Sequence, residues 1–185
     1  MTEELVEILD EDGKFTDDVK PKKAAHKYGY WHQASQIWIY NSKGEILLQK
    51  RAKDKDSYPG LWDISVAGHV SAHETPENAA LREMREEIGV ELKTNELKKI
   101  DVRKDSLKIP ELDWNNNEFV HVFLWRFNGN INKLKLLDGE VESLKFISLG
   151  KLESEISDPY LSKNYVPHGR YYFDVIKAIR NELNK

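Results

Sequence analysis

Three glutamates near the middle of the chain have a spacing that places acidic side chains on one face of a helix. Glu83, Glu86 and Glu87 stand three and four residues apart, and residues at these spacings are neighbours on a helix surface. Like charges placed this way repel by roughly 0.2–0.5 kcal/mol per pair, and a bound cation removes that repulsion. Hard ions such as Mg²⁺ take oxygen ligands and are often shared between one or two carboxylates and phosphate oxygens of a substrate. The glutamates therefore indicate a divalent-metal site, with a solvated acidic face as the simpler interpretation.

Local signals place these glutamates on a helix that runs from about Pro76 to Ile88. Thr75 suits the N-cap, Pro76 suits the first helical position, and Gly89 follows the last periodic residue as a stop signal. The apolar residues of this helix fall on a different face from the glutamates, and they are Ala80, Leu81, Met84 and Ile88. The helix is thus expected to pack through one side and to present its acids on another.

A longer pattern surrounds the helix. Its fixed positions are Gly68, Glu74, Arg82, Glu83, Met84, Glu86, Glu87, Gly89 and Val90. This pattern resembles the complete signature box of the Nudix hydrolases, a match of many fixed positions at fixed gaps. The resemblance implies a diphosphate-cleaving enzyme in which Glu83, Glu86 and Glu87, helped by the Gly68 carbonyl, lie at the metal site. It also implies that Arg82 and Glu74 form an ion pair that braces the loop against the helix.

Ala67 and His73 stand where many members of that family have glycine. His73 falls on a tight loop that often requires a positive φ, a conformation that most side chains disfavour.

The region from about Lys22 to Glu118 resembles one branch of the superfamily, the isopentenyl-diphosphate isomerases and their hydrolase relatives. The resembling segments are KKAAH at 22–26, His32, LLQKR at 47–51, Lys55, PGLW at 59–62, Gly68-His69 and NNNEF around Glu118. In that branch the positions that match Lys22, Arg51 and Lys55 bind the substrate diphosphate. The positions that match His26, His32, His69 and Glu118 belong to a second metal site. The residue types agree, because cations suit phosphate, and imidazole with carboxylate suits a divalent metal.

The same resemblance favours hydrolysis over isomerisation. The isomerase reaction protonates carbon, and the branch uses a cysteine just before the Gly-His pair, where this chain has Ala67. A methyl group does no acid–base work. Asn116 stands where a further acidic ligand is expected, and the spacing from His26 to His32 is one residue shorter than in the isomerases. The glutamate box, which the isomerases have largely lost, is complete here.

Length, charge and cysteine content narrow the class further. A chain of 185 residues predicts one domain over 1–185, with an N-terminal hairpin and basic segment at 1–30 and the box at 68–90. The net charge of −4 argues against a general nucleic-acid partner. The absence of cysteine excludes disulfides and thiolate metal sites. Without a long apolar run or a signal-like N-terminus, we expect a cytoplasmic protein that does not enter membranes, as a monomer or homodimer.

The sequence also predicts the strands and helices that position these residues. Strands are predicted in a hairpin at Val6–Phe15, in a second hairpin at Ala34–Tyr40 and Glu45–Lys50, and at Trp62–Ala67, Leu97–Arg103, Glu118–Phe127 and Glu142–Ile147. A basic loop is expected at 20–33 and a polar loop at 108–118, and further helices at Leu149–Ile156 and Arg170–Leu183. The fold class is therefore α/β, with a mixed sheet in the layered α/β/α sandwich that the family resemblance also implies.

The prediction for function is Mg²⁺-dependent hydrolysis, with Mn²⁺ as the alternative ion, of a diphosphate linkage in a nucleoside di- or triphosphate or similar small molecule. Glu83 is the first candidate for the general base and Glu118 the second. Three alternatives stay open: an isomerase with an unusual acid, a nucleotide- or polyphosphate-binding sensor without turnover, and an interaction module that uses the terminal helix. His121 and His168 have no motif beside them and are assigned structural roles.

Overall fold

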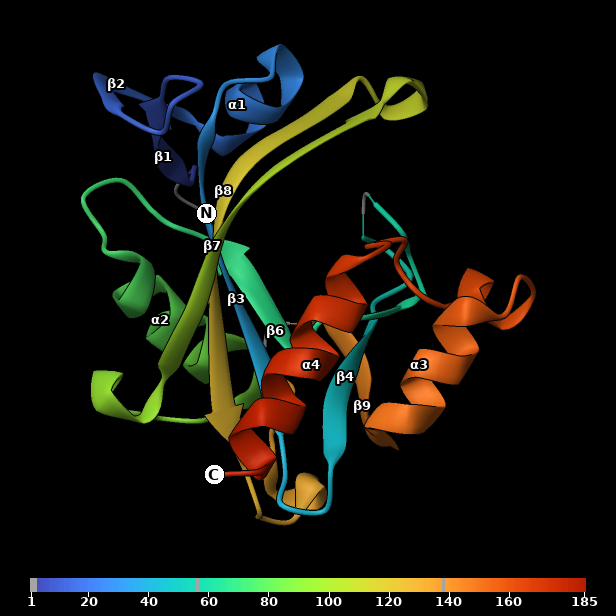
Figure 1. Ribbon diagram of the computed structural model, residues 1–185. Coiled ribbons are helices and arrows are strands. Elements are labelled where there is room, and N and C mark those ends of the chain that lie inside the picture. The colour runs from blue at the N-terminus through green and yellow to red at the C-terminus, as the bar shows by residue number, and fades with distance from the viewer. Residues whose placement is uncertain (1–2, 56, 138) are drawn as a thin grey trace.

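The computed structural model describes residues 3–55, 57–137 and 139–185, and Figure 1 shows how its elements are arranged. The strands are β1 (Leu5–Leu9), β2 (Phe15–Pro21), β3 (His32–Tyr40), β4 (Glu45–Arg51), β5 (Trp62–Asp63), β6 (Val66–His69), β7 (Lys98–Ile109), β8 (Trp114–Arg126) and β9 (Val141–Ser148). The helices are α1 (Lys22–Tyr28), α2 (Pro76–Ile88), α3 (Leu149–Ser157) and α4 (Tyr171–Leu183), with 3₁₀ turns at Thr94–Glu96, Pro110–Leu112, Ile131–Lys133 and Leu161–Asn164. Among the described helices, none has the length and apolar content needed to cross a bilayer.

Strand β3 lies at the centre of the main sheet. Its residues Ile37, Trp38 and Ile39 are fully buried, as expected for a strand that is covered on both faces. It runs parallel to β8 over its whole length, from His32↔Glu118 to Tyr40↔Arg126. Its other edge pairs antiparallel with β6 and, at Tyr40, with β4. The predicted mixed sheet is confirmed.

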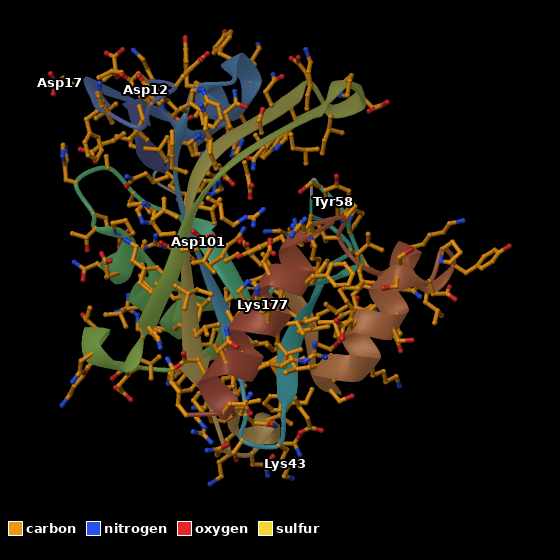
Figure 2. The ribbon with its side chains drawn as sticks, viewed as in Figure 1. Asp12, Asp17, Lys43, Tyr58, Asp101 and Lys177 are labelled. Atoms are coloured by element: carbon orange, nitrogen blue, oxygen red, sulfur yellow. The ribbon has the colours of Figure 1, made fainter. Side chains whose placement is uncertain are left out.

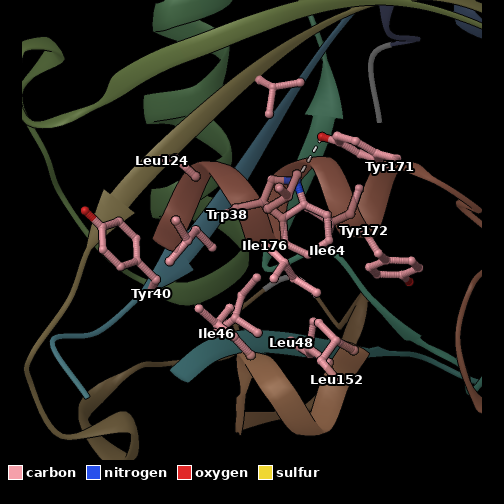
Figure 3. Close-up of a cluster of buried hydrophobic side chains, with 14 of the residues drawn as sticks. Trp38, Tyr40, Ile46, Leu48, Ile64, Leu124, Leu152, Tyr171, Tyr172 and Ile176 are labelled. Carbon is pink, nitrogen blue, oxygen red and sulfur yellow. Dashed lines mark hydrogen bonds between the residues drawn. The ribbon is translucent and has the colours of Figure 1, made fainter. Parts of the chain in front are cut away.

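Helices cover both faces of this sheet (Figure 1). On one face, Ala80, Met84 and Ile88 of α2 pack against alternate residues of β3 and their neighbours. On the other face, α3 and α4 cover Trp38 and the residues around it, and Figure 3 shows this cluster. There the Trp38 indole Nε1 donates a hydrogen bond to the Tyr171 hydroxyl at 2.8 Å. The chain therefore forms the α/β/α sandwich that the sequence predicts.

Helix α2 begins and ends at the predicted residues. The Thr75 Oγ1 accepts a hydrogen bond from the backbone N–H of Asn78 at 3.2 Å, which satisfies one of the free donors of the first turn. Gly89 ends the helix with a φ of 68°, a conformation that glycine adopts without strain. His73, in the loop before the helix, has a φ of 67°, so a histidine does occupy the left-handed conformation there.

The other elements also lie close to their predicted positions, with two differences at the N-terminal end. β1 pairs with β2 in the predicted N-terminal hairpin, but β2 extends to Pro21. The segment 20–33, predicted as a basic loop, contains α1 and the start of β3. The predicted strand Trp62–Ala67 is divided into β5 and β6 around Ser65, whose hydroxyl donates to the Leu47 carbonyl at 2.6 Å.

The polar loop predicted at 108–118 is wrong. Strands β7 and β8 continue through most of it and pair as far as Ile109↔Trp114. Asparagines disfavour strands by themselves, but here tertiary contacts hold them. Asn115 Nδ2 donates to the Lys27 carbonyl at 3.1 Å, and Asn117 Nδ2 donates to the Gly29 carbonyl at 2.8 Å. These bonds satisfy carbonyls at the end of α1. Because the bonded residues are far apart in the sequence, the local pattern does not predict the bonds.

The buried His121 of β8 predicts a pH-dependent stability. Its side chain is 9% exposed, and neither ring nitrogen has a hydrogen-bond partner among the described residues. Burial, aided by Lys99, lowers the pKa of His121 to about 4. The unfolded chain binds this proton near pH 6.5, so above pH 6.5 the ring is neutral in both states and the fold keeps its full stability. Below pH 6.5 the unfolded chain takes up the proton before the folded protein does, and this destabilises the fold. The loss, roughly 3 kcal/mol, develops as the pH falls toward 4.

We expect His121→Leu to be more stable than the wild type at pH 4.5 and to lose less stability between pH 6.5 and pH 4.5. Urea unfolding across this range measures both. The exposed His73, replaced by asparagine because asparagine tolerates a positive φ, serves as the control and should unfold like the wild type. Parallel pH profiles for His121→Leu and the wild type would contradict the assignment.

Candidate active site

A cavity of about 1090 Å³ opens on the side of the sheet where β3 and β4 separate. The two strands pair at Tyr40↔Ile46, after which β3 pairs with β6 instead. Tyr58, in the loop between β4 and β5, also lines the cavity and is labelled in Figure 2. The cavity brings together most of the site residues predicted from sequence, namely Lys22, Arg51, Lys55, Gly68, His69, Glu83, Glu86 and Glu118.

Arg82 organises the acidic side of the cavity. Its guanidinium donates to both carboxylate oxygens of Glu74, at 3.2 and 3.0 Å, and to the His69 carbonyl at 2.9 Å. The same side chain also contacts Glu83 at 2.5 Å and Glu86 at 3.1 Å through Nη1. The predicted pairing of Arg82 with Glu74 is therefore present, and Arg82 additionally neutralises two of the predicted metal ligands.

The Glu83 carboxylate lies directly against the backbone of Gly68. A Cβ at Gly68 would come within 2.0 Å of the Glu83 carboxyl group, so any larger residue at this position would displace it. Burial raises the pKa of Glu83 to about 7, even though Arg82 opposes the shift. A carboxyl group with a pKa near neutrality suits the uptake and release of a proton.

Glu87 is the most deeply buried of the three glutamates, in a small chamber that shares Arg51, Lys55, Ala67 and Glu140 with the main cavity. It is 3% exposed, and Gln49 also lines this chamber of about 30 Å³. Among the described residues, the glutamates of α2 do not form a set of converging ligand atoms in this structure, whereas another cluster does.

The three predicted diphosphate-binding cations all reach the cavity, each held by a carboxylate. Lys22 pairs with Glu4 and Lys55 pairs with Glu140. Arg51 Nη1 contacts Asp63 Oδ2 at 2.9 Å, and its Nε donates to the Ser57 carbonyl at 3.0 Å. A bound anion would therefore meet cations that are already oriented, in competition with these carboxylates.

The converging cluster consists of His26 from α1, His32 from β3, His69 from β6 and Glu118 from β8. One ligand atom from each residue lies within 4.8 Å of the others. The His26 and His69 Nε2 atoms are 3.1 Å apart, and Glu118 Oε1 lies 3.2 Å from His69 Nε2. The cluster therefore assembles all four residues that the isomerase resemblance assigns to a second metal site.

The chemistry of this donor set fits a divalent metal ion. His32 Nδ1 lies 2.9 Å from the Tyr30 carbonyl, a contact that requires the proton on Nδ1, so that in the neutral ring Nε2 is the acceptor that faces the cluster. That buried His32 Nε2 has no hydrogen-bond partner among the described residues. Burial and the neighbouring His69 lower the pKa of His26 to about 3, so this ring is neutral and able to act as a ligand.

Glu118 is held as a carboxylate in the same cluster. Burial alone would raise its pKa, but contacts with His32 and His69 hold the pKa of Glu118 well below its usual range. The Trp114 ring stacks on His26 with centroids 3.7 Å apart and covers this side of the cluster. Asn116 also lines the cavity but offers an amide in place of the acidic ligand expected in an isomerase.

A second group of residues lines the cavity without any sequence motif. His168, assigned a structural role from sequence, lines the cavity with its Nε2 2.7 Å from Asp63 Oδ1. Arg103 lies over the face of Tyr171, with the guanidinium carbon 4.0 Å from the ring centroid. No local motif surrounds these residues, and only the folded arrangement of β5, β7 and α4 brings them together.

Comparison with known proteins gives a consistent result. The NUDIX domain family model matches residues 30–168. Nudix hydrolase 3 of Arabidopsis thaliana is 36% identical over an alignment that covers 96% of this chain. The chain spans 24% of the length of that longer protein. An uncharacterized Nudix hydrolase of Clostridium acetobutylicum is 33% identical over 82% of this chain and 73% of its own length. An isopentenyl-diphosphate Delta-isomerase of Salmonella paratyphi B is 41% identical over 93 residues, 50% of this chain and 51% of that protein.

Solved structures share the fold at low sequence identity. The crystal structure of DR0079 from Deinococcus radiodurans superposes with a TM-score of 0.68 at 19% identity and covers 95% of this chain and 98% of its own. The NUDIX domain of Shewanella oneidensis NrtR, crystallised with ADP ribose, gives a TM-score of 0.57 at 13% identity over 82% of this chain and 87% of its own. The complete glutamate box, the sandwich fold and the family match over residues 30–168 together establish that this chain belongs to the Nudix hydrolase family.

Proposed function

We propose that the protein hydrolyses the diphosphate linkage of a nucleotide-like small molecule in a reaction that requires Mg²⁺ or Mn²⁺. The observation that carries this proposal is that acids and cations face one another across a single cavity. Glu83 and Glu86 line it from α2, and Lys22, Arg51 and Lys55 line it from α1, β4 and the following loop. A metal ion on the acidic side and a diphosphate held by the cations would satisfy both sets of charges.

Lys22 and Lys55 are proposed to bind the diphosphate by exchanging a carboxylate partner for phosphate oxygens, whereas Arg51 keeps its contact with Asp63 and binds phosphate through its other N–H donors. Arg51 can engage two oxygens at once because its guanidinium is planar and presents paired donors. Lys22 and Lys55 act as single charges, and their partners Glu4 and Glu140 must move aside or share them. The competition with Glu4 and Glu140 favours ligands of high negative charge over singly charged ones.

Two places are proposed for divalent ions. Glu83 and Glu86, with the Gly68 carbonyl, form the acidic place, and the buried Glu87 supports it from the adjoining chamber. His26, His32, His69 and Glu118 form the second. A bound divalent ion would polarise the phosphoryl group and acidify a water molecule.

Glu83 is the proposed general base. In the metal-free protein burial raises the pKa of Glu83 to about 7, so this group can carry a proton near neutral pH, whereas contacts with His32 and His69 lower the pKa of Glu118 and make that carboxylate a poorer proton acceptor. Glu118 is therefore better suited to bind a metal ion. The contrast supports the first of the two bases predicted from sequence.

The assembled histidine cluster is the one observation that favours isomerisation of isopentenyl diphosphate as a second candidate. Ala67 opposes it, because this residue lines the cavity with a methyl group that cannot protonate carbon. Because residues 1–30 supply Glu4 and Lys22 to the cavity that the box at 68–90 completes, and His26 to the histidine cluster, we also propose that they belong to one domain.

The proposal is tested by assaying the purified protein against a panel of diphosphates with Mg²⁺ or Mn²⁺ and measuring released phosphate or nucleotide. The panel contains nucleoside di- and triphosphates, sugar nucleotides, ADP-ribose and isopentenyl diphosphate. We expect hydrolysis of at least one member, its loss on chelation with EDTA and its recovery when the ion is returned. Isomerisation of isopentenyl diphosphate, or no turnover of any member, would contradict the proposal.

Glu118→Gln is expected to weaken Mn²⁺ binding at the histidine cluster by at least 10-fold, because it removes the only carboxylate of that ligand set. Isothermal titration calorimetry measures the affinity. Glu111→Gln, which removes a carboxylate near the end of β7 outside the cluster, is the control. Unchanged Mn²⁺ binding in Glu118→Gln would show that the cluster is not a metal site.

A further inference from the structure

Asp63 connects the proposed diphosphate-binding cations to the opposite wall of the cavity. Its side chain is 7% exposed, and its two oxygens bind different partners. Oδ2 accepts from Arg51 Nη1 at 2.9 Å, and Oδ1 lies 2.7 Å from His168 Nε2 and 2.8 Å from the backbone N–H of Ile64. Arg51 and His168 are thus held in a defined relation by one buried carboxylate.

These contacts determine where the His168 ring carries its proton. Burial alone would raise the pKa of Asp63, but His168 and Arg51 lower it, so Asp63 is ionised and can only accept hydrogen bonds. The nitrogen that faces it, Nε2, must therefore be the donor. In the neutral ring this leaves Nδ1 as a hydrogen-bond acceptor.

The position of His168 gives that acceptor access to a ligand. The side chain is 21% exposed, and both His168 and Tyr171 line the cavity beside Gln36 and Arg103. The His168 ring meets the Tyr171 ring edge-on with centroids 5.9 Å apart. None of the described residues forms a hydrogen bond with Nδ1 of His168, whose ring contacts Asp63 through Nε2. A continuous row of contacts therefore runs from Arg51 through Asp63 and His168 to Tyr171.

We propose that His168 is a specificity-determining residue that accepts, through Nδ1, a hydrogen bond from a hydroxyl of the group attached to the diphosphate, and that Asp63 positions His168 and Arg51 for this. The inference rests on the proposed function only in placing a diphosphate against Arg51. It predicts a substrate whose attached group carries hydroxyls, as a sugar does, and not an alkyl chain. A site that hydrogen-bonds a hydroxyl discriminates strongly against an analogue that lacks it.

Binding of three non-hydrolysable probes in the presence of Mg²⁺ tests this without any need for turnover. Methylenediphosphonate carries no attached group, α,β-methylene-ADP carries a ribose with hydroxyls, and its 2′,3′-dideoxy analogue lacks them. We expect the wild type to bind α,β-methylene-ADP at least 10-fold more tightly than the dideoxy analogue. In His168→Phe this ratio should fall below 2, while the affinity for methylenediphosphonate stays within 2-fold of the wild type.

Asp63→Asn is expected to reduce both the preference for α,β-methylene-ADP over its dideoxy analogue, here called the hydroxyl ratio, and the affinity for methylenediphosphonate. Both should fall because the substitution releases His168 and Arg51 together. The ¹⁵N chemical shifts of the His168 ring provide a separate signature and should show a proton on Nε2 in the wild type and a mixture of tautomers in Asp63→Asn. Asp18→Asn removes an exposed carboxylate of β2 outside the cavity lining and should match the wild type in every measurement.

Each result has a definite meaning. An unchanged hydroxyl ratio in His168→Phe, no hydroxyl preference in the wild type, or an equal loss of all three probes in His168→Phe would overturn the role of His168. If the hydroxyl preference is found but no diphosphate is hydrolysed, the proposed function fails and the binding role of His168 stands.

Discussion

The Glu86→Gln/Glu87→Gln protein is expected to lose at least 1000-fold in kcat/KM for the diphosphate that the wild type hydrolyses. A loss of this size corresponds to about 4 kcal/mol of transition-state stabilisation, as expected when the charge that holds a catalytic divalent ion is removed. The fold should persist. The Glu86 side chain is 45% exposed and pairs only with arginines of its own helix in the described structure, and glutamine preserves the shape of both residues.

A matched control exists on the same helix. Glu77 lies in the first turn of α2 and forms a 3.5 Å contact with Lys99, outside the cavity lining. Glu77→Gln should therefore retain wild-type kcat/KM. Circular dichroism and thermal unfolding of all three proteins would establish that they are folded. Wild-type turnover by the double variant would show that these acids do not serve the reaction.

Replacing Arg82 by leucine is expected to destabilise the fold by about 3 kcal/mol, because it leaves partly buried carboxylates without their partner. The Glu74 and Glu83 side chains are 16% and 13% exposed, and Arg82 is the cation that contacts both. Arg82→Lys should fall between the wild type and Arg82→Leu, because lysine keeps the charge but cannot bind both oxygens of Glu74 and the His69 carbonyl together. Urea denaturation at neutral pH measures the difference.

Two further measurements separate the structural role of Arg82 from its effect on metal binding. In the double variant Glu74→Gln/Arg82→Leu, the loss should be smaller than the sum of the two single losses, because the residues interact directly. Added Mg²⁺ should restore part of the stability of Arg82→Leu, because the ion can bind Glu83 and Glu86 in place of the guanidinium. It should not compensate for the lost contact with Glu74, which lies in the loop before α2. A loss below 1 kcal/mol for Arg82→Leu would contradict the organising role given to this side chain.

The parts of this fold that could be predicted from sequence depend on local information. The ends of α2 follow from Thr75, Pro76 and Gly89, which act within a few residues of their own position. The glutamate box carries its chemistry at fixed spacing on a single helix. The cations Lys22, Arg51 and Lys55 were identified only through the family resemblance, and the structure places all three at the cavity.

The parts that could not be predicted depend on contacts between distant segments. Asn115 and Asn117 resemble a turn until the carbonyls at the end of α1 are placed beside them. The pairing of His168 with Asp63 joins residues 105 positions apart, and no spacing rule predicts it. The burial of Glu87 also depends on such contacts, because residues on one helix face can lie at different depths once other segments pack against the helix.

Anomalous diffraction from crystals soaked with Mn²⁺ and methylenediphosphonate would show whether divalent ions and a diphosphate meet in this cavity. We expect an anomalous peak beside Glu83 and Glu86, with diphosphate oxygens between that ion and Arg51, and a second peak within the cluster of His26, His32, His69 and Glu118. A map without either peak, in which Glu83 and Glu86 still contact Arg82 and the diphosphate lies elsewhere, would contradict this expectation.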